Sequence, residues 1–365
     1  MLKNIFNIII LLIVLNFVYG QSKGNSKGTG KVYTAPLTVS NDIYYMMNVG
    51  IGTPSQRFNI LLSTGSADFF VPAFNITTNK PKFFPKKSST FSSPKPQKYL
   101  NFPDIRGEVQ GIVGIDTIEF AGLKQPKLEF SMADLIDKQT LADPYDGIMG
   151  LGFAKLSKAE SKNPVLAAID NNLLAQKMFT LYLKGGYPSN SKNMQGGQAT
   201  FGGFDTKNCG QRLGSVKFTG GGRYQFQIDR SEHLLESLSI YFTIKDNYFI
   251  AISDSSSGDI IGNRAVINKF TQQVGARWSD QDGAYIIHCR ATPSLTLKIG
   301  GVDYTLTKDV LIYRIANNKC GLAVGGMDRT KEGFDWVLGS PFMRKFCHTF
   351  DIGNNQLTFS QVKNL

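Results

Sequence analysis

The sequence predicts an all-β chain that folds into two similar lobes. Its 365 residues are enough for two hydrophobic cores, and a composition with 42% hydrophobic and 19% charged residues is typical of a globular protein. Glycine is abundant, at 37 residues, and β-branched and aromatic residues occur in short runs bounded by turn residues. In addition, an apolar strand running into a small, hydroxyl-rich turn occurs twice, at 58–66 and at 249–257.

The first twenty residues have the features of a secretory signal peptide. Lys3 precedes a mostly apolar run from Ile8 to Val18, and Val18 and Gly20 occupy the two positions that a signal peptidase reads. The run is too short to span a bilayer, and no later stretch is long and apolar enough to do so. We expect residues 1–20 to be removed and the protein to be secreted or delivered to a lumenal, lysosome-like compartment.

The residues that follow are predicted to form a lead-in and then two lobes. Residues 21–35 begin with a stretch rich in glycine, serine and lysine, which predicts a flexible lead-in or a residual pro-segment. We place the first lobe at residues 36–204 and the second at residues 205–365. Spacing that suits antiparallel hairpins predicts strands at 43–50, 56–62, 68–72, 109–118 and 128–133, then at 224–229, 241–253, 285–288, 295–299 and 357–359. Helices are expected at 165–174 and 263–274, with a turn near 155–162.

Cysteine and histidine usage predicts disulfides and argues against a metal site. Four cysteines in an oxidising compartment indicate two disulfides, with three pairings open: Cys209, Cys289, Cys320 and Cys347. No Cys-x-x-Cys spacing occurs, and the three histidines are not spaced as a metal-binding pair, so we expect neither a metal nor another cofactor. Asn75 begins an Asn-Ile-Thr sequence, a glycosylation acceptor that a secreted loop tolerates.

The chain is basic, with a formal net charge of +12. Part of that charge lies in the segment 79–98, which has six lysines, four prolines and no acidic residue. Such a surface attracts anionic glycans, membranes or acidic proteins, although a solvated loop is the simpler interpretation. We expect a monomer, with no nucleic-acid partner.

Several segments around the repeat match a known family. An apolar pair and a glycine follow each copy, and other matching stretches occur in order: Asn48–Pro54, Phe69–Pro72, Ser88–Phe91, Tyr145–Gly152 and Trp336–Gly339. Together they resemble the pepsin family of aspartic proteases over nearly the whole mature chain, including secreted relatives of the nematode type. The resemblance implies a bilobal β fold whose two turns face each other across a cleft. It also suggests the pairings Cys289–Cys320 and Cys209–Cys347.

The family places one catalytic aspartate in each turn, and only one of them is present here. The first turn of the family reads Asp-Thr-Gly-Ser, whereas this chain has Ser63 followed by Thr64, Gly65 and Ser66. The second aspartate is retained as Asp254. A hydroxyl at Ser63 does not ionise in the working pH range and cannot act as a carboxylate base, and losing a general acid or base costs ~10²–10⁴-fold in rate.

Four further departures affect the same region. Ser255 replaces a threonine and keeps the hydroxyl that ties the turns together, whereas Ser256 replaces a glycine and crowds the space near the dyad. Counting back from Gly111 places Asp104 where the family's flap has a tyrosine. Phe70 replaces the tryptophan that usually bonds to that tyrosine.

These residues predict a pepsin-like pseudoprotease that acts by binding a peptide or protein in its cleft. The resemblance extends to inactive secreted relatives, such as mammalian pregnancy-associated glycoproteins and a cockroach allergen. Two alternatives remain open: a weakly active endopeptidase that uses Asp254 and an ordered water, and an anionic glycan or surface binder that uses the basic segment. The sequence does not favour a serine hydrolase, because the chain has no Gly-x-Ser-x-Gly elbow and no histidine in a recognisable triad context.

Overall fold

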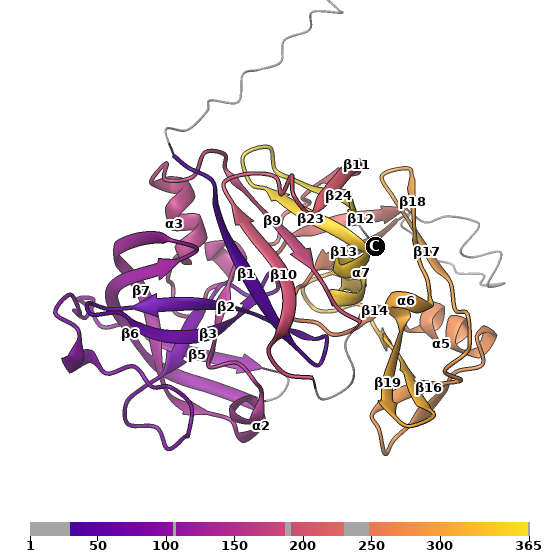
Figure 1. The fold of residues 1–365 in the computed structure, drawn as a ribbon, viewed down its shortest axis with the longest axis horizontal. Coiled ribbons are helices and arrows are strands. Elements are labelled where there is room, and N and C mark those ends of the chain that lie inside the picture. The colour runs from indigo at the N-terminus through magenta and orange to yellow at the C-terminus, as the bar shows by residue number, and fades with distance from the viewer. Residues whose placement is uncertain (1–29, 105–106, 187–190, 230–247, 364–365) are drawn as a thin grey trace, which may run out of the picture.

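The structure is a computed structural model that describes residues 30–104, 107–186, 191–229 and 248–363. The predicted signal peptide, residues 21–29 of the lead-in and residues 241–247 of a predicted strand lie outside this range. Residues 33–35 of the predicted lead-in already belong to the first strand. Figure 1 shows the β-rich first lobe in indigo and purple beside a second lobe in orange, with β9, β10 and β23 between them. The expected bilobal, all-β fold is confirmed.

The largest sheet has thirteen strands in the order β11-β24-β23-β9-β10-β1-β2-β3-β8-β4-β7-β6-β5. Because β23 and β24 pair onto β9, the end of the chain completes a sheet that belongs mostly to the first lobe. Its strands are β1 (Tyr33–Ser40), β2 (Tyr44–Ile51), β3 (Gln56–Ser63), β4 (Phe69–Pro72), β5 (Tyr99–Asp104), β6 (Gly107–Phe120), β7 (Leu123–Ile136), β8 (Gly147–Gly150), β9 (Met178–Leu183), β10 (Met194–Phe201), β11 (Cys209–Lys217), β23 (Phe346–Asp351) and β24 (Gln356–Val362).

Two smaller sheets form the second lobe. A seven-stranded sheet has the order β18-β17-β12-β13-β22-β14-β21, and a four-stranded sheet the order β15-β16-β20-β19. Their strands are β12 (Gln225–Asp229), β13 (Tyr248–Ser253), β14 (Ile260–Asn263), β15 (Arg277–Ser279), β16 (Ala284–Ile287), β17 (Leu295–Ile299), β18 (Val302–Leu306), β19 (Ile312–Ala316), β20 (Lys319–Leu322), β21 (Val324–Met327) and β22 (Trp336–Leu338).

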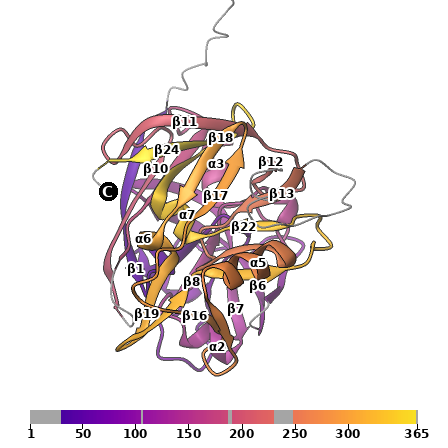
Figure 2. The ribbon, with the colours of Figure 1, turned by 90° about the vertical axis from the view of Figure 1, so that its right-hand side faces the viewer.

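Short helices cover the edges of these sheets. The two predicted helices are present as α3 (Pro164–Asp170) and α5 (Arg264–Gln273), and each begins after an asparagine whose side chain accepts two backbone N–H bonds. The predicted turn near 155–162 is the 3₁₀ turn η2 (Ala154–Leu156). In Figure 2, α5 lies across the second lobe, where it contacts β14 and β21. The remaining helices are η1 (Pro85–Lys87), α2 (Lys138–Ala142), α6 (Lys308–Leu311) and α7 (Ser340–Lys345).

The internal repeat of the sequence is a repeat of topology. In the first lobe β3 pairs in parallel with β8, and β4 pairs antiparallel with β8 and in parallel with β7. In the second lobe β13, β22, β14 and β21 make the same set of pairings. The expected arrangement of antiparallel hairpins is therefore wrong at the centre of each lobe. The reason is that each return strand comes from far along the chain, which lets it run parallel to the first.

Both lobes enclose buried side chains, and two disulfides are present, one in the second lobe and one between two strands of the large sheet. Cys289 pairs with Cys320, and Cys209 pairs with Cys347, as the resemblance suggested. One large hydrophobic cluster extends through both lobes, and a second cluster lies beneath β5 and β6. Among the described residues, no helix is long and apolar enough to cross a membrane.

Candidate active site

The two hydroxyl-rich turns meet where the lobes join. Ser63 is the last residue of β3, and Asp254 directly follows β13, so the shared topology places both side chains at equivalent points. Thr64 and Ser255 tie the turns together. Each backbone N–H donates to the hydroxyl of the other residue, at 3.1 Å and 2.9 Å, and the hydroxyls donate to the carbonyls of Ser253 and Leu62, at 2.8 Å and 2.6 Å. All four bonds are buried, so the serine at 255 keeps the function expected of a threonine.

Ser256 connects the position of the missing aspartate to the remaining one. Its hydroxyl donates to Asp254 Oδ1 at 2.7 Å, and its backbone N–H donates to the same oxygen at 2.9 Å. The Ser256 Oγ also lies 3.0 Å from the Oγ of Ser63, which is almost fully buried. Because a hydroxyl has one proton, which Ser256 gives to the carboxylate, Ser63 is the donor in the second bond. Hydrogen bonds thus connect Ser63, Ser256 and Asp254 in series at the place where the family has two facing carboxylates.

Gly65 is the counterpart of Ser256 in the first turn, and it shows why a glycine belongs there. A Cβ atom built on Gly65 would lie 2.2 Å from Asp254 Oδ2 and 2.5 Å from its Cγ, closer than Cβ atoms approach other atoms. The carboxylate of Asp254 therefore packs directly against the Gly65 backbone. By the same symmetry, the side chain of Ser256 points at residue 63, and it fits there because residue 63 is a serine.

Two neighbouring polar side chains take no part in the hydrogen bonds among Ser63, Ser256 and Asp254. Asp68, the nearest aspartate after Ser63, is buried and holds another loop: it accepts bonds from the Ser157 hydroxyl at 2.7 Å and from the backbone N–H groups of Lys158 and Ala159 at 3.0 Å. It cannot take the place of the missing carboxylate. The Ser66 Oγ, in the same turn as Ser63, is buried without a hydrogen-bond partner among the described residues.

The two predicted departures near the flap, Asp104 and Phe70, lie on different strands of the large sheet, β5 and β4. Asp104 ends β5 and pairs with Gly107 of β6, so it stands at the tip of the β5–β6 hairpin. Phe70, on β4, is buried in the cluster beneath that hairpin, with Leu100 of β5 and Val109 of β6. Asp104 therefore lies at the tip of the hairpin that we predicted to be the flap, and Phe70 beneath it has a ring without a hydrogen-bond donor.

Sequence reasoning missed Arg223, which reaches the site from the second lobe. Its Nη1 donates to the carbonyl of Gly65, and its guanidinium lies 5.8 Å from the ring centroid of Phe334. A cation is thereby held beside the glycine on which the Asp254 carboxylate packs. The only sequence signal was a run of three glycines directly before the arginine.

A buried histidine behind the second turn was also missed. His348, on β23, is fully buried, and its Nδ1 lies 2.8 Å from the Oγ of Ser253, the residue before Asp254. Burial among aromatic rings lowers the pKa of His348 from 6.5 to about 3, so the ring is neutral at physiological pH. Burial has the opposite effect on the pKa of Asp259, which lies five residues after Asp254. It raises the pKa of Asp259 to about 6, although Arg344 opposes this shift.

Some lysines of the basic segment 79–98 have partners within the protein and are not available to a ligand. Lys80 donates to the carbonyls of Asp143 and Tyr145, and burial lowers its pKa, although Asp146 and Asp143 oppose this shift. Lys98 forms an ion pair with Glu129 at 2.9 Å. Of the six lysines, only three are exposed: Lys86, Lys87 and Lys95. Asn75, the predicted glycosylation acceptor, is exposed near this segment. No cluster that could hold a metal ion is found in the described part of the chain.

Comparison with known proteins agrees with the fold. The family model of the eukaryotic aspartyl proteases matches residues 44–362. The chain is 32% identical to aspartic protease 6 of Caenorhabditis elegans, covering 87% of this chain and 82% of that protein. It is 30% identical to chymosin of Ovis aries, with 92% and 85% covered, and 28% identical to pepsin A of Bos taurus, with 90% and 86% covered. The chain belongs to the eukaryotic aspartyl protease family, the pepsin-like aspartic proteases.

Proposed function

We propose that this protein is a secreted pseudoprotease, which retains the pepsin-like fold and binds peptides or proteins without cleaving them. The observation that carries the proposal is the position of the Ser256 hydroxyl, which bonds to both Ser63 and Asp254. Secretion is supported by the signal features of residues 1–20 and by the two disulfides.

The chemistry of the family requires two carboxylates that share a proton over a bound water. One takes the proton of the water, while the other, protonated, polarises the scissile carbonyl. Ser63 cannot take the proton of the water, because an alcohol remains protonated throughout the pH range in which a carboxylate titrates. Its own proton is already donated to the Ser256 Oγ, and a neutral alcohol is a weaker donor to the scissile carbonyl than a carboxylic acid. Asp254 is left as a single carboxylate, and its Oδ1 already accepts two bonds from Ser256. The arrangement therefore favours a stable, inactive site.

Retention of a binding surface is supported by the ties between the lobes. The four hydrogen bonds of Thr64 and Ser255 hold the turns in place although one carboxylate is absent. We infer that the protein captures an extended peptide or a protein segment between its lobes, and that it does so as a monomer.

A peptide library tests this proposal. The purified mature protein is incubated with the library at acidic and at neutral pH, and bound and free peptides are identified by mass spectrometry. The proposal expects a bound subset that is recovered uncut and is displaced by a pepsin-type transition-state inhibitor. It fails if no peptide is retained, or if retained peptides are cleaved in the wild type and intact with Asp254→Asn, which would support the weakly active endopeptidase instead.

A further inference from the structure

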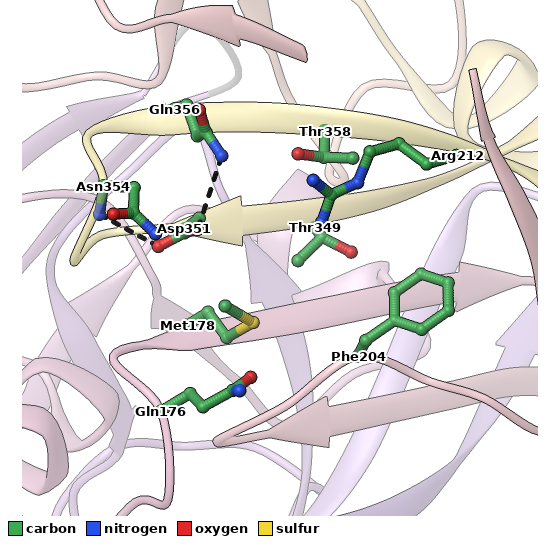
Figure 3. Close-up of a pocket in the computed structure, with 9 residues that line it drawn as sticks. All are labelled: Gln176, Met178, Phe204, Arg212, Thr349, Asp351, Asn354, Gln356 and Thr358. Atoms are coloured by element: carbon green, nitrogen blue, oxygen red, sulfur yellow. Dashed lines mark hydrogen bonds between the residues drawn. The ribbon is translucent and has the colours of Figure 1, made fainter. Parts of the chain in front are cut away.

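A pocket away from the two turns lies on the sheet that joins the lobes. It has a volume of about 340 Å³ and is built on the adjacent strands β9, β23, β24 and β11 (Figure 3). This volume is within the range of small-ligand sites, roughly 300–1,000 Å³. The Cys209–Cys347 disulfide ties β11 to β23 at one side of the pocket, so its walls are covalently linked. The proposed pseudoprotease function does not use this pocket.

Arg212 supplies a cation to this pocket. It extends from β11, and Figure 3 shows its guanidinium lying beside Thr358 and Thr349 at one end of the pocket. Arg212 is exposed, and among the described residues its guanidinium makes no ion pair and no hydrogen bond. An arginine in this state presents its planar set of N–H donors, which matches the geometry of a carboxylate.

The opposite end of the pocket holds a carboxylate, Asp351, whose oxygens are hydrogen-bonded to neutral amide groups. Asp351 accepts bonds from the backbone and the side chain of Asn354, at 3.0 Å and 2.7 Å, and from Gln356 at 3.5 Å. These bonds hold the two carboxamides at the pocket wall, as Figure 3 shows. Each carboxamide retains an oxygen that can accept a bond, so this end suits hydroxyl groups, which both donate and accept.

An apolar wall completes the pocket between these two ends. Met178 and Phe204 line it on the side away from β24 (Figure 3). The apolar face of a sugar ring packs well against such side chains, while its hydroxyls reach the polar groups around it. We propose that this pocket binds a small sugar acid, with the carboxylate on Arg212, the ring against Met178 and Phe204, and the hydroxyls on the carboxamides of Asn354 and Gln356.

Calorimetric titration of the mature protein with D-glucuronate, D-glucose and inorganic phosphate tests this assignment. Glucuronate is expected to bind more tightly than either of the others, because glucose lacks the carboxylate and phosphate lacks the ring and its hydroxyls. Arg212→Gln is expected to weaken glucuronate binding about 10- to 100-fold, the usual effect of losing a charge-assisted pair. Gln356→Ala is expected to weaken glucuronate and glucose alike.

Arg314→Gln is the matched control, because Arg314 is an exposed arginine on β19, in a different sheet, and its loss changes the net charge by the same amount. It should leave glucuronate binding unchanged. An equal loss in both arginine variants would mean that overall charge, not the pocket, attracts the anion. The assignment is also overturned if glucuronate does not bind, or if glucose or phosphate binds as tightly. Melting curves of each variant verify that the fold is intact.

Discussion

Restoring the missing aspartate alone should damage this protein rather than activate it. The relevant change is Ser63→Asp, and the structure gives the reason. Gly65 and Ser256 are equivalent residues, and a Cβ on Gly65 would lie 2.2 Å from a carboxylate oxygen of Asp254. An aspartate at 63 would meet the existing Cβ of Ser256 at a similarly short distance. It would also place a second carboxylate beside Asp254.

The size of this effect follows from the contacts. Forcing atoms into a packed site costs about 1–3 kcal/mol, so Ser63→Asp should destabilise the protein by that amount. Replacing Ser256 with glycine removes the obstructing Cβ. The change costs the Ser256 hydroxyl bond to Asp254 in the wild type, a charge-assisted bond worth about 1.5–3 kcal/mol. In the double variant Ser63→Asp with Ser256→Gly, the two costs should not add, and we expect a coupling of about 1–3 kcal/mol in favour of the pair.

A double-mutant cycle measured by urea unfolding at neutral pH gives this coupling directly. Ser257→Gly is the control, since Ser257 lies in the same turn but donates to the carbonyl of Asp259, not toward residue 63. It should not rescue Ser63→Asp. Peptide hydrolysis at acidic pH should follow the same pattern, appearing only in the variant that combines Ser63→Asp with Ser256→Gly. Additive free energies, or turnover by Ser63→Asp alone, would refute the symmetry argument.

Three further predictions follow from other contacts. The pKa of His348 is about 3 in the fold and 6.5 in the unfolded chain, so protonation of this residue favours unfolding. The contribution of His348 to the free energy of unfolding should therefore fall by about 1.4 kcal/mol per pH unit as the pH drops from 6.5 toward 3. His348→Leu should remove this slope in urea titrations at stepped pH. The raised pKa of Asp259 stabilises the fold in acid, and this benefit is lost as the pH rises from 3.8 to about 6. Asp259→Asn should therefore change the pH dependence of the unfolding free energy in the sense opposite to His348→Leu. An unchanged pH dependence in either variant would contradict the assignment of that residue. Thr64→Val should cost about 1–3 kcal/mol in unfolding free energy, because it leaves the Ser255 N–H and the Ser253 carbonyl without their buried partner, whereas Thr64→Ser should be nearly neutral.

Much of the fold could be predicted from the sequence, because its signals are local or repeated. The strands and helices were indicated by short apolar runs, and the helix starts by Asn163 and Asn263, whose side chains cap α3 and α5. The parallel pairing of β3 with β8 could not be predicted in this way. It depends on which strand returns to the centre of the lobe, and that is decided by packing over more than eighty residues of chain.

The site was predictable in its residues but not in its geometry. The motif identified Ser63, Asp254 and Ser256, and it indicated that Ser256 crowds the dyad. It did not indicate that the Ser256 hydroxyl would form a bond on each side, because that bond joins residues 193 positions apart. Arg223 and His348 left almost no signal for the same reason: their roles come from partners on other strands. The six lysines of the basic segment looked alike in sequence, yet Lys80 and Lys98 have structural partners.

The central claim is that Asp254 does no proteolytic work in this protein. Single-turnover hydrolysis of a peptide library at acidic pH, with protein in excess and products read by mass spectrometry, tests it most directly. The wild type and Asp254→Asn are compared side by side, with the double variant that combines Ser63→Asp and Ser256→Gly as the positive reference. We predict that the wild type and Asp254→Asn give the same product yield, at the level of the peptides alone. Cleavage by the wild type that disappears in Asp254→Asn would contradict the account.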